Sequence, residues 1–318
     1  FFKQKTAYEI KYYVTLEAAL AAVGSGTGTI TMLKDKTISD FDERIVIPTG
    51  ADITLDLNGH TITSAIPCAG GAHDSTYVVE VEEGATLNLV DNSDAKGGQF
   101  VHTTGDIGTT FLRNAGTLNM SDVDVRDFFY GILDNSTTNV FNGNPGTYGI
   151  ISNCDFTTVH RTLNFEEGSV GTIEGCTIEM TGSGSGGLGA YYALYLEKGG
   201  TINLLEDCHI TSEAQNTVQI SGRIETIMDC TIVNGRIPQS GEEIAAIFLN
   251  NGASIGTITS TSPEKHTSIT GTVRCVGGSI DLIKGEDTLF KLPSIPAKGS
   301  EWYNIYVGGN TDHIGEIG

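Results

Sequence analysis

Two aspartates, two arginines and a histidine are the residues of this chain whose types and spacing could do chemistry together. Asp124 and Asp155 hold the same place in successive copies of a repeat; Arg126 follows the first, and His160 and Arg161 follow the second. If the repeat places the two carboxylates about 5 Å apart, they could bind Ca²⁺ or act as acid and nucleophile of a retaining glycosidase. The alternative is a solvated face with ordinary ion pairs.

The repeat that must position these residues has two apolar residues three apart, then a small or apolar residue, then another apolar one. The third position of successive copies falls at Val123, Cys154, Cys176, Cys208 and Cys230, with a weaker sixth copy ending at Thr261. The steps between copies are 31, 22, 32, 22 and 31 residues. Such a period is typical of a solenoid, whose coils bury their apolar faces only against their neighbours.

The repeat unit is β rather than α. Each copy is rich in Ile, Val, Thr and Leu, turn-forming residues close each run, and 41 glycines exclude long helices. Loops within 181–189 and 236–243 account for two of the longer steps. We therefore predict an all-β fold, a right-handed parallel β-helix with three short strands per coil.

The third position of each copy, here called the slot, and the residues directly before and after it have distinct expected roles. The four cysteines are expected to form a buried inward ladder rather than disulfides, because a free Cys behaves as a small hydrophobe. Alternation along the strand turns the next position, Asp124 and Asp155, outward. The preceding column favours a left-handed bend, and it reads Asp122, Asn153, Gly175, Asp207 and Asp229.

The start of the solenoid has a recognisable form. Residues 15–23 predict a short capping helix, with Thr15 as N-cap and Gly24 beyond its end. The segments GTITML, RIVIP and DITLDLNGHTI follow, and with this helix they resemble the entry of pectate-lyase-like right-handed β-helix proteins, which include secreted and cell-surface proteins of bacteria. The resemblance covers roughly residues 12–285 and is sharpest over 15–62.

The resemblance implies a fold more than an activity, because the family holds lyases, hydrolases, tailspikes and non-catalytic adhesins. For a polysaccharide lyase it implies Ca²⁺ at Asp124 and Asp155, with Arg126, Arg161 or His160 near the base position. The polygalacturonase motif pattern of this fold is missing from the chain. Ca²⁺ is the only cofactor that the residues suggest.

Aromatic residues near the inserted loops offer a second kind of site. An exposed ring can stack on the apolar face of a sugar, and a long sheet could present a track for a polymer. The alternative is that the rings cover the core at the bends. The carbohydrate-binding candidates are Phe129, Tyr130, Tyr191 and Tyr192, with Phe128 and Tyr195 beside them.

Composition excludes several partners. The net charge of −21 disfavours nucleic acid and anionic membranes, and no apolar run approaches the roughly 20 residues of a membrane span. An acidic, Gly- and Thr-rich surface is compatible with an extracellular or cell-surface location.

The two ends carry separate expectations. Residues 1–10 contain KQKTAYEI, which a common sequencing-adapter oligonucleotide would encode, so we predict a non-native segment there. Residues 11–290 are predicted to be the β-helix domain, and 291–318 a truncated C-terminal cap or linker.

The sequence thus predicts a non-catalytic extracellular module of a larger bacterial protein that contacts a polysaccharide or host glycan. A Ca²⁺-assisted polysaccharide lyase, a less favoured glycoside hydrolase and a purely structural spacer are the alternatives.

Overall fold

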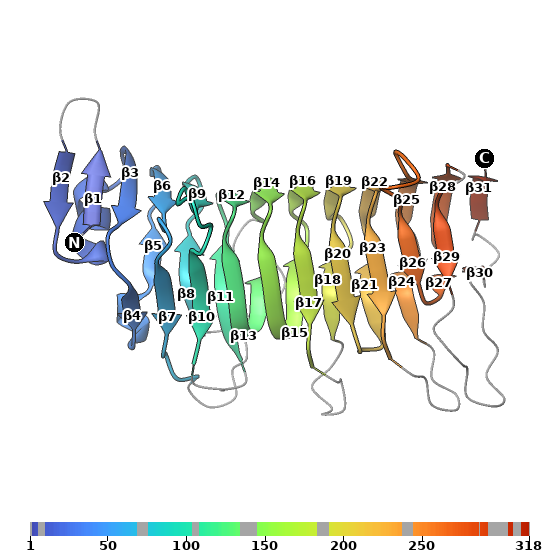
Figure 1. Cartoon of the computed structure of the whole chain (residues 1–318), viewed down its shortest axis with the longest axis horizontal. Coiled ribbons are helices and arrows are strands. Elements are labelled where there is room, and N and C mark those ends of the chain that lie inside the picture. Colours follow the sequence, from blue (N-terminus) through green and yellow to red (C-terminus); the bar gives the residue numbers. More distant parts are fainter. Residues whose placement is uncertain are drawn as a thin grey trace. The chain divides into compact units, whose positions relative to one another are not determined.

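The computed structural model describes residues 2–5, 10–68, 76–103, 108–133, 145–182, 191–236, 244–285, 287–291, 305–307 and 313–317. Within these ranges the chain is a right-handed parallel β-helix, as predicted (Figure 1). It divides into two compact units, Phe1–Thr157 and Thr158–Gly318, and each is described by itself. No helix of the described residues is both long and apolar enough to cross a membrane.

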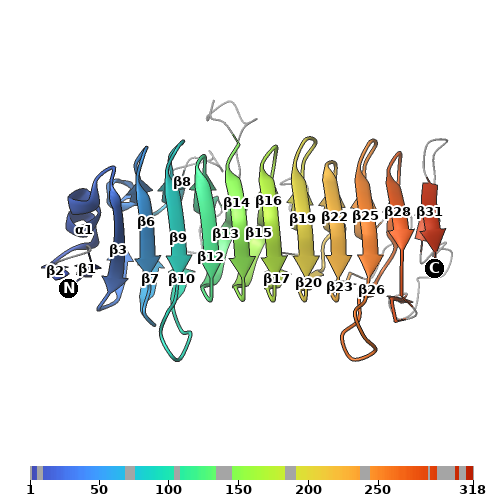
Figure 2. The ribbon, with the colours of Figure 1, turned by 90° about the horizontal axis from the view of Figure 1, so that it is seen from above.

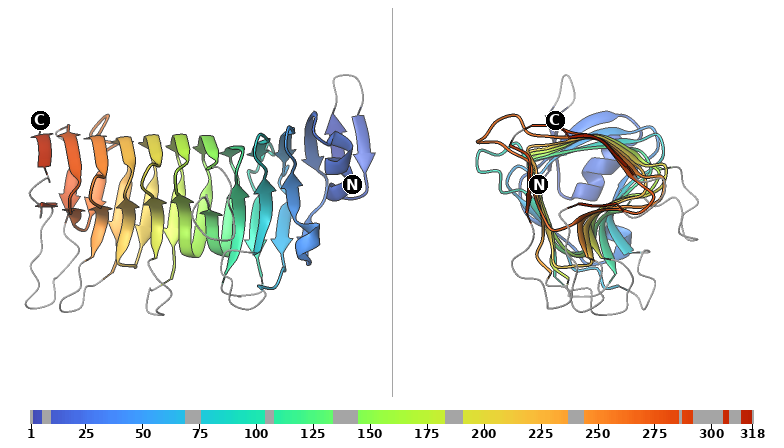
Figure 3. Two further views of the ribbon diagram at one scale, coloured as in Figure 1. Left: turned by 180° about the vertical axis from the view of Figure 1, so that it is seen from behind. Right: turned by 90° about the vertical axis from the view of Figure 1, so that its right-hand side faces the viewer.

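In both units each full coil contributes one strand to each of three faces, which we call A, B and C in chain order. Strands of one face lie side by side and pair in parallel with the next coil (Figure 2). Within each unit the coils wind around buried apolar side chains, and the end-on view in Figure 3 shows the path of the backbone. The three faces are therefore three rows of stacked strands around one core per unit.

In the first unit, face A contains β3 (Thr27–Met32), β6 (Asp52–Asp56), β9 (Thr86–Val90), β12 (Thr117–Ser121) and β14 (Thr147–Ser152). Face B contains β4 (Lys36–Ile38), β7 (Thr61–Ser64), β10 (Gln99–His102) and the start of β13 (Asp124–Leu133). Face C contains β5 (Ile45–Ile47), β8 (Thr76–Val81), β11 (Thr109–Asn114) and the end of β13, and a short 3₁₀ turn, η1 (Phe41–Glu43), precedes β5.

The second unit continues the same order. β15 (Asp155–Phe165) begins in the first unit, and its end lies on face C of the second. Face A contains β16 (Ser169–Glu174), β19 (Thr201–Glu206), β22 (Arg223–Met228), β25 (Ser254–Thr259), β28 (Ser279–Ile283) and β31 (His313–Ile317). Face B contains β17 (Thr177–Met180), β20 (His209–Ser212), β23 (Thr231–Asn234), β26 (Ser268–Thr270) and β29 (Leu289–Lys291). Face C contains β18 (Tyr192–Leu196), β21 (Asn216–Ile220), β24 (Ala245–Leu249), β27 (Val273–Cys275) and β30 (Ile305–Val307).

The strand register places residues of the same type next to one another in successive coils. On face A of the second unit, Ile202 pairs with Ile224, Ile224 with Ile255, and Ile255 with Ile280. All four side chains are fully buried, so each coil buries its apolar row against its neighbours, as a solenoid requires.

The predicted cap is present. Helix α1 (Leu16–Val23) begins after Thr15, whose hydroxyl accepts a hydrogen bond from the Ala18 N–H at 3.1 Å, and Gly24 ends it with a φ of 58°. The helix lies across the end of the first coil (Figure 3). Beside it, β1 (Phe2–Lys5) and β2 (Ile10–Tyr13) form an antiparallel hairpin against β3.

The third position of the repeat is buried, as predicted, at Val123 and at the four cysteines. Cys154, Cys176, Cys208 and Cys230 are buried, and each Sγ donates a hydrogen bond to the carbonyl two residues earlier. The preceding column has positive φ at every position, which confirms the bend; it comprises Asp122, Asn153, Gly175, Asp207 and Asp229.

The structure contradicts the prediction for the sixth copy of the repeat. Thr261 is exposed and does not continue the buried slot. The chain instead forms an inserted bend at 260–267, after which Ser268 pairs with Thr231 on face B. The carboxylate of Asp229 fixes this bend by accepting hydrogen bonds from the Thr261 N–H at 2.7 Å and from its hydroxyl at 2.5 Å.

Candidate functional site

Part of the group predicted for lyase chemistry lies together at the start of face B in the first unit. Arg126 Nη2 lies 2.7 Å from Asp124 Oδ2. That hydrogen bond is the main reason why the pKa of Arg126 is raised, and the charges of Asp155 and Asp127 add to the effect. The arrangement is an ion-pair cluster in which one guanidinium faces three carboxylates.

The other two residues of that group lie in the second unit. His160 is fully buried, and its ring centroid is 4.0 Å from that of Tyr191. Arg161 interacts electrostatically with Tyr192 and Glu197. A base must reach its substrate, and the His160 side chain lies inside the β-helix, so the proposed base role has no support at this position.

The metal and stacking candidates stay predictions. Among the described residues, no group of three or more His, Cys, Asp and Glu side chains could hold a metal ion, so a Ca²⁺ site rests on Asp124 and Asp155 alone. The four candidate rings present almost no surface to a sugar, because Phe129, Tyr130, Tyr191 and Tyr192 are only 3–8% exposed.

A different group of residues forms a partly exposed row on face C of the second unit. Tyr195 pairs with Gln219, Gln219 with Phe248, and Phe248 with Arg274 on the successive strands β18, β21, β24 and β27. Their strand neighbours point inward and are buried, so these four side chains point outward. With strands about 4.8 Å apart, the row offers two aromatic rings, an amide and a guanidinium in register.

A second row lies beside the first, where each of these strands ends. The N–H of Glu197 donates to the Phe165 carbonyl, that of Ser221 to Leu196, and that of Asn250 to Ile220. Glu166, Glu197, Ser221 and Asn250 therefore occupy equivalent places on successive coils. We call these two rows together the face C strip, defined by Tyr195, Gln219, Phe248, Arg274, Glu166, Glu197, Ser221 and Asn250.

Contacts hold the side chains of the strip in place. Tyr195 stacks on the buried Tyr192 with ring centroids 4.9 Å apart. The Asn216 amide donates to Gln219 Oε1 at 2.8 Å, and the Asn250 amide to the Ser221 hydroxyl at 2.7 Å. The Arg274 guanidinium lies 5.6 Å from the centre of the Phe248 ring. A surface held in this way loses little side-chain entropy on binding.

Charge and burial shift the pKa values at one end of the strip. Burial raises the pKa of Glu197, and the nearby carboxylates of Glu166 and Glu167 raise it further, against the opposing effects of Tyr195 and Arg161. Burial also raises the pKa of Tyr195 to about 12, with the charge of Glu197 adding to the shift. Perturbed groups of this kind gather at functional sites more often than elsewhere.

On face C of the first unit, the paired residues Glu80 and Arg113 belong to an ion-pair cluster. Glu80 accepts hydrogen bonds from Arg113 at 3.1 Å, from Tyr77 at 3.2 Å and from Arg44 at 3.4 Å. The Arg44 guanidinium also lies 4.4 Å from the ring centre of Phe41. These groups satisfy one another, which indicates a structural role.

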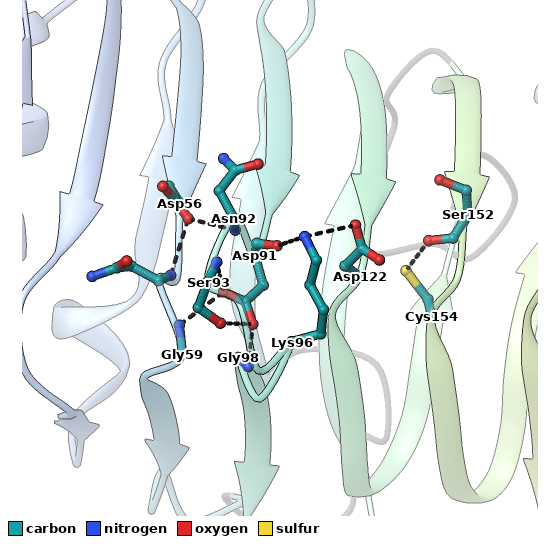
Figure 4. A network of polar contacts seen from close by, with 11 residues as sticks. Asp56, Gly59, Asp91, Asn92, Ser93, Lys96, Gly98, Asp122, Ser152 and Cys154 are labelled. Carbon is teal, nitrogen blue, oxygen red and sulfur yellow. Dashed lines mark hydrogen bonds and ion pairs between the residues drawn. The ribbon is translucent and has the colours of Figure 1, made fainter.

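Another polar network of the first unit surrounds Asp91, at the inserted bend 92–98 (Figure 4). Its fully buried carboxylate accepts hydrogen bonds from the N–H groups of Gly59, Ser93 and Gly98 at 2.8, 3.0 and 2.6 Å, and from the Ser93 hydroxyl at 2.9 Å. Lys96 donates to the Asp91 carbonyl at 2.8 Å. The network attaches the bend to the β-helix.

A sequence signal for the face C strip exists, although the repeat that we aligned did not include it. Four tetrapeptides share the order small or polar, apolar, variable, apolar: Ala-Leu-Tyr-Leu at 193–196, Thr-Val-Gln-Ile at 217–220, Ala-Ile-Phe-Leu at 246–249 and Thr-Val-Arg-Cys at 272–275. The variable positions of the four tetrapeptides are the residues of the outward row, Tyr195, Gln219, Phe248 and Arg274. The steps from one tetrapeptide to the next are unequal, 24, 29 and 26 residues, because the intervening segments contain the bends, and this hides the alignment.

Comparison of the chain with protein-family models, curated proteins and solved structures gave no match. The site therefore has to be argued from its own geometry.

Proposed function

We propose that this protein is a non-catalytic carbohydrate-binding module of a larger bacterial secreted or cell-surface protein, within the pectate-lyase-like β-helix superfamily. The observation that carries the proposal is the outward row Tyr195–Gln219–Phe248–Arg274, in which rings alternate with hydrogen-bonding groups. Rings supply apolar contact to the C–H face of a sugar, and amides and carboxylates bind its hydroxyls. The acidic composition fits an extracellular location.

Several observations favour binding over cleavage. A lyase needs its metal ligands and its base around one bound sugar, and His160 is fully buried. Arg126 is already paired with Asp124 at 2.7 Å. The face C strip instead repeats its chemistry along the solenoid, which suits several sugar units of one polymer.

The experiment compares retention of the protein on a panel of immobilised neutral, acidic and amino polysaccharides. We expect wild type to be retained on at least one polysaccharide and Phe248→Ala to lose about tenfold in affinity for it, as one good anchor ring accounts for about 1–2 kcal/mol. Thr226→Ala, an outward change on face A, is the matched control and should bind as wild type does.

The same samples are assayed for cleavage by ultraviolet absorbance of unsaturated sugars and by reducing ends. Cleavage that disappears in Asp124→Asn or Arg126→Ala would establish the lyase and overturn the proposal. Retention that neither Phe248→Ala nor Tyr195→Ala reduces would show that the polysaccharide binds to another surface of the protein. No retention on any polysaccharide would favour the structural spacer.

A further inference from the structure

The outward row of face C alternates between two kinds of residue. Strand pairing adds one position at each end of the row, because Asn164 on β15 pairs with Tyr195 and Arg274 pairs with Tyr306 on β30. Along successive coils the row then reads Asn164, Tyr195, Gln219, Phe248, Arg274 and Tyr306. Every second position is aromatic, and Asn, Gln and Arg occupy the positions between. Asn164 is buried, so the accessible part of the row begins at Tyr195.

This alternation sets the separation of the two exposed rings. Tyr195 and Phe248 are both partly exposed, and they lie two strand spacings apart, about 9.6 Å. Tyr195 is held by stacking on Tyr192, and Phe248 lies beside the Arg274 guanidinium. The strip therefore offers two rings at a fixed separation, with the Gln219 amide between them.

A two-fold polysaccharide chain matches this period. In an extended β-linked chain each sugar is rotated by half a turn relative to the previous one, so every second unit presents the same face. Two units of such a chain span about the length of two strand spacings. Rings two coils apart can then stack on alternate units of one straight chain, and Gln219 faces the hydroxyls of the unit between them. A helical chain turns its units out of this register and can contact only one of the rings at a time.

The charges of the strip argue for an uncharged chain. At one end Tyr195 is hydrogen-bonded to the carboxylate of Glu197, and at the other the Arg274 guanidinium lies 5.6 Å from the centre of the Phe248 ring. A polymer charged on every unit, of either sign, would meet a like charge at one of the two rings. The net charge of −21 further opposes a polyanion. The hydroxyls of a neutral sugar can donate to the carboxylate and accept from the amide and the guanidinium.

We propose that the face C strip binds a neutral, extended β-linked polysaccharide along its row, with one sugar unit per coil. The inference rests on the proposed function and specifies its ligand class. It differs from that function in what it excludes, namely helical and anionic chains.

The test uses two hexasaccharides of glucose that differ only in their linkage: cellohexaose, which is β-linked and extended, and maltohexaose, which is α-linked and helical. Binding to the whole protein is measured by isothermal titration calorimetry. We expect wild type to bind cellohexaose about tenfold more tightly, the effect of one additional anchor ring. The hexamer of cellouronic acid, which keeps the linkage and carries a carboxylate on every unit, should bind more weakly than cellohexaose.

Variants test the spacing itself. Gln219→Phe combined with Phe248→Gln keeps the same side chains but moves the second ring to the coil next to Tyr195, so the preference for cellohexaose should be lost. Phe248→Ala removes the ring and should bring the two affinities together. Thr226→Ala on face A is the control and should keep the preference. Thermal denaturation shows whether each variant is folded, and the comparison of the two hexasaccharides on wild type does not depend on any variant.

Each outcome bears on the ligand class or on both proposals. Equal affinity of wild type for the two hexasaccharides, tighter binding of maltohexaose or cellouronic acid, or a preference that survives the exchange of Gln219 and Phe248 would overturn the ligand class. If neither hexasaccharide binds, retention on another neutral, extended β-linked polysaccharide would support the ligand class. Retention only on helical or charged polysaccharides would overturn it and leave the proposed function standing. If no glycan binds at all, both proposals fail.

Discussion

Asp91 in the first unit and Glu197 in the second are carboxylates that directly follow a strand, yet their neighbours are of opposite kinds. Burial alone would raise the pKa of Asp91, but hydrogen bonds from Ser93, Gly98 and Gly59 outweigh it, so the pKa is lowered. Burial raises the pKa of Glu197, and the neighbouring carboxylates add to the rise. Burial acts in the same direction at both sites, and the neighbours decide the outcome.

This difference separates a carboxylate whose charge the fold compensates from one whose charge the fold opposes. The charge of Asp91 is compensated by donors of its own chain, so a ligand would have nothing to add. The charge of Glu197 is opposed by burial and by the charges of Glu166 and Glu167, and Tyr195 and Arg161 compensate this opposition only in part. In a chain with a net charge of −21, carboxylates are too numerous to mark a site by themselves, and their partners are the useful criterion.

The largest effect is expected from Asp91→Asn. The amide would accept fewer hydrogen bonds and would turn an N–H toward backbone donors, so we expect a loss of about 2–4 kcal/mol in the free energy of unfolding. Urea denaturation measures it. Asp94→Asn changes an exposed carboxylate of the same bend and should cost little. A loss below about 0.5 kcal/mol for Asp91→Asn would show that the bend does not depend on this charge.

The pH dependence of that loss follows from the lowered pKa. A carboxylate with a lowered folded-state pKa stabilises the fold above its unfolded pKa, about 3.9, and the contribution is lost as pH falls through the folded value. The difference between wild type and Asp91→Asn should therefore be full at neutral pH and shrink in acid. A difference that grows on acidification would contradict the assignment.

Phe248→Ala comes next and concerns function rather than the fold. The ring is partly exposed, and its described contact is with Arg274. We expect the melting temperature to change by only a few degrees, while affinity for the retained polysaccharide falls about tenfold. Calorimetry and thermal denaturation of the same sample measure both. A large fall in melting temperature would assign Phe248 to structure.

Much of the fold could be predicted from the sequence, because the buried positions of a solenoid repeat. The cysteine slot, the left-handed bends and the capping helix each depend on a local preference: a small apolar residue, a residue that accepts positive φ, and an N-cap before an apolar run. The prediction for Thr261 was wrong because an inserted bend delays the next strand, and a fixed spacing cannot detect such an insertion.

The candidate site was harder to predict, because outward positions are not constrained by the core. Phe129, Tyr130, Tyr191 and Tyr192 were chosen as exposed rings, and the structure buries them. Phe248 looked like one more residue of an apolar run, Ala-Ala-Ile-Phe-Leu at 245–249. Only alternation within that strand, compared with equivalent strands of other coils, distinguishes the outward ring from its buried neighbours.

A smaller effect of opposite sign is expected from Glu197→Gln. A carboxyl group with a raised folded-state pKa contributes stability below its unfolded pKa, about 4.3, and loses it as pH rises through the folded value. At neutral pH the charge of Glu197 therefore opposes folding, and the neutral amide should raise the melting temperature. Near pH 4 the advantage should vanish. Thermal scans across this range provide the measurement, and a variant less stable than wild type at neutral pH would show that hydrogen bonds to Glu197 outweigh its repulsion.

The smallest effect is spectroscopic. Burial, with the charge of Glu197 adding to it, places the pKa of Tyr195 at about 12, so its ionisation should follow that of the exposed tyrosines. The difference in ultraviolet titration between wild type and Tyr195→Phe isolates this phenol. Glu197→Gln removes one source of repulsion and should move the ionisation of Tyr195 to lower pH. Because Tyr195 and Glu197 lie on the same strip, an unchanged titration would mean that the charge of Glu197 does not act on this phenol.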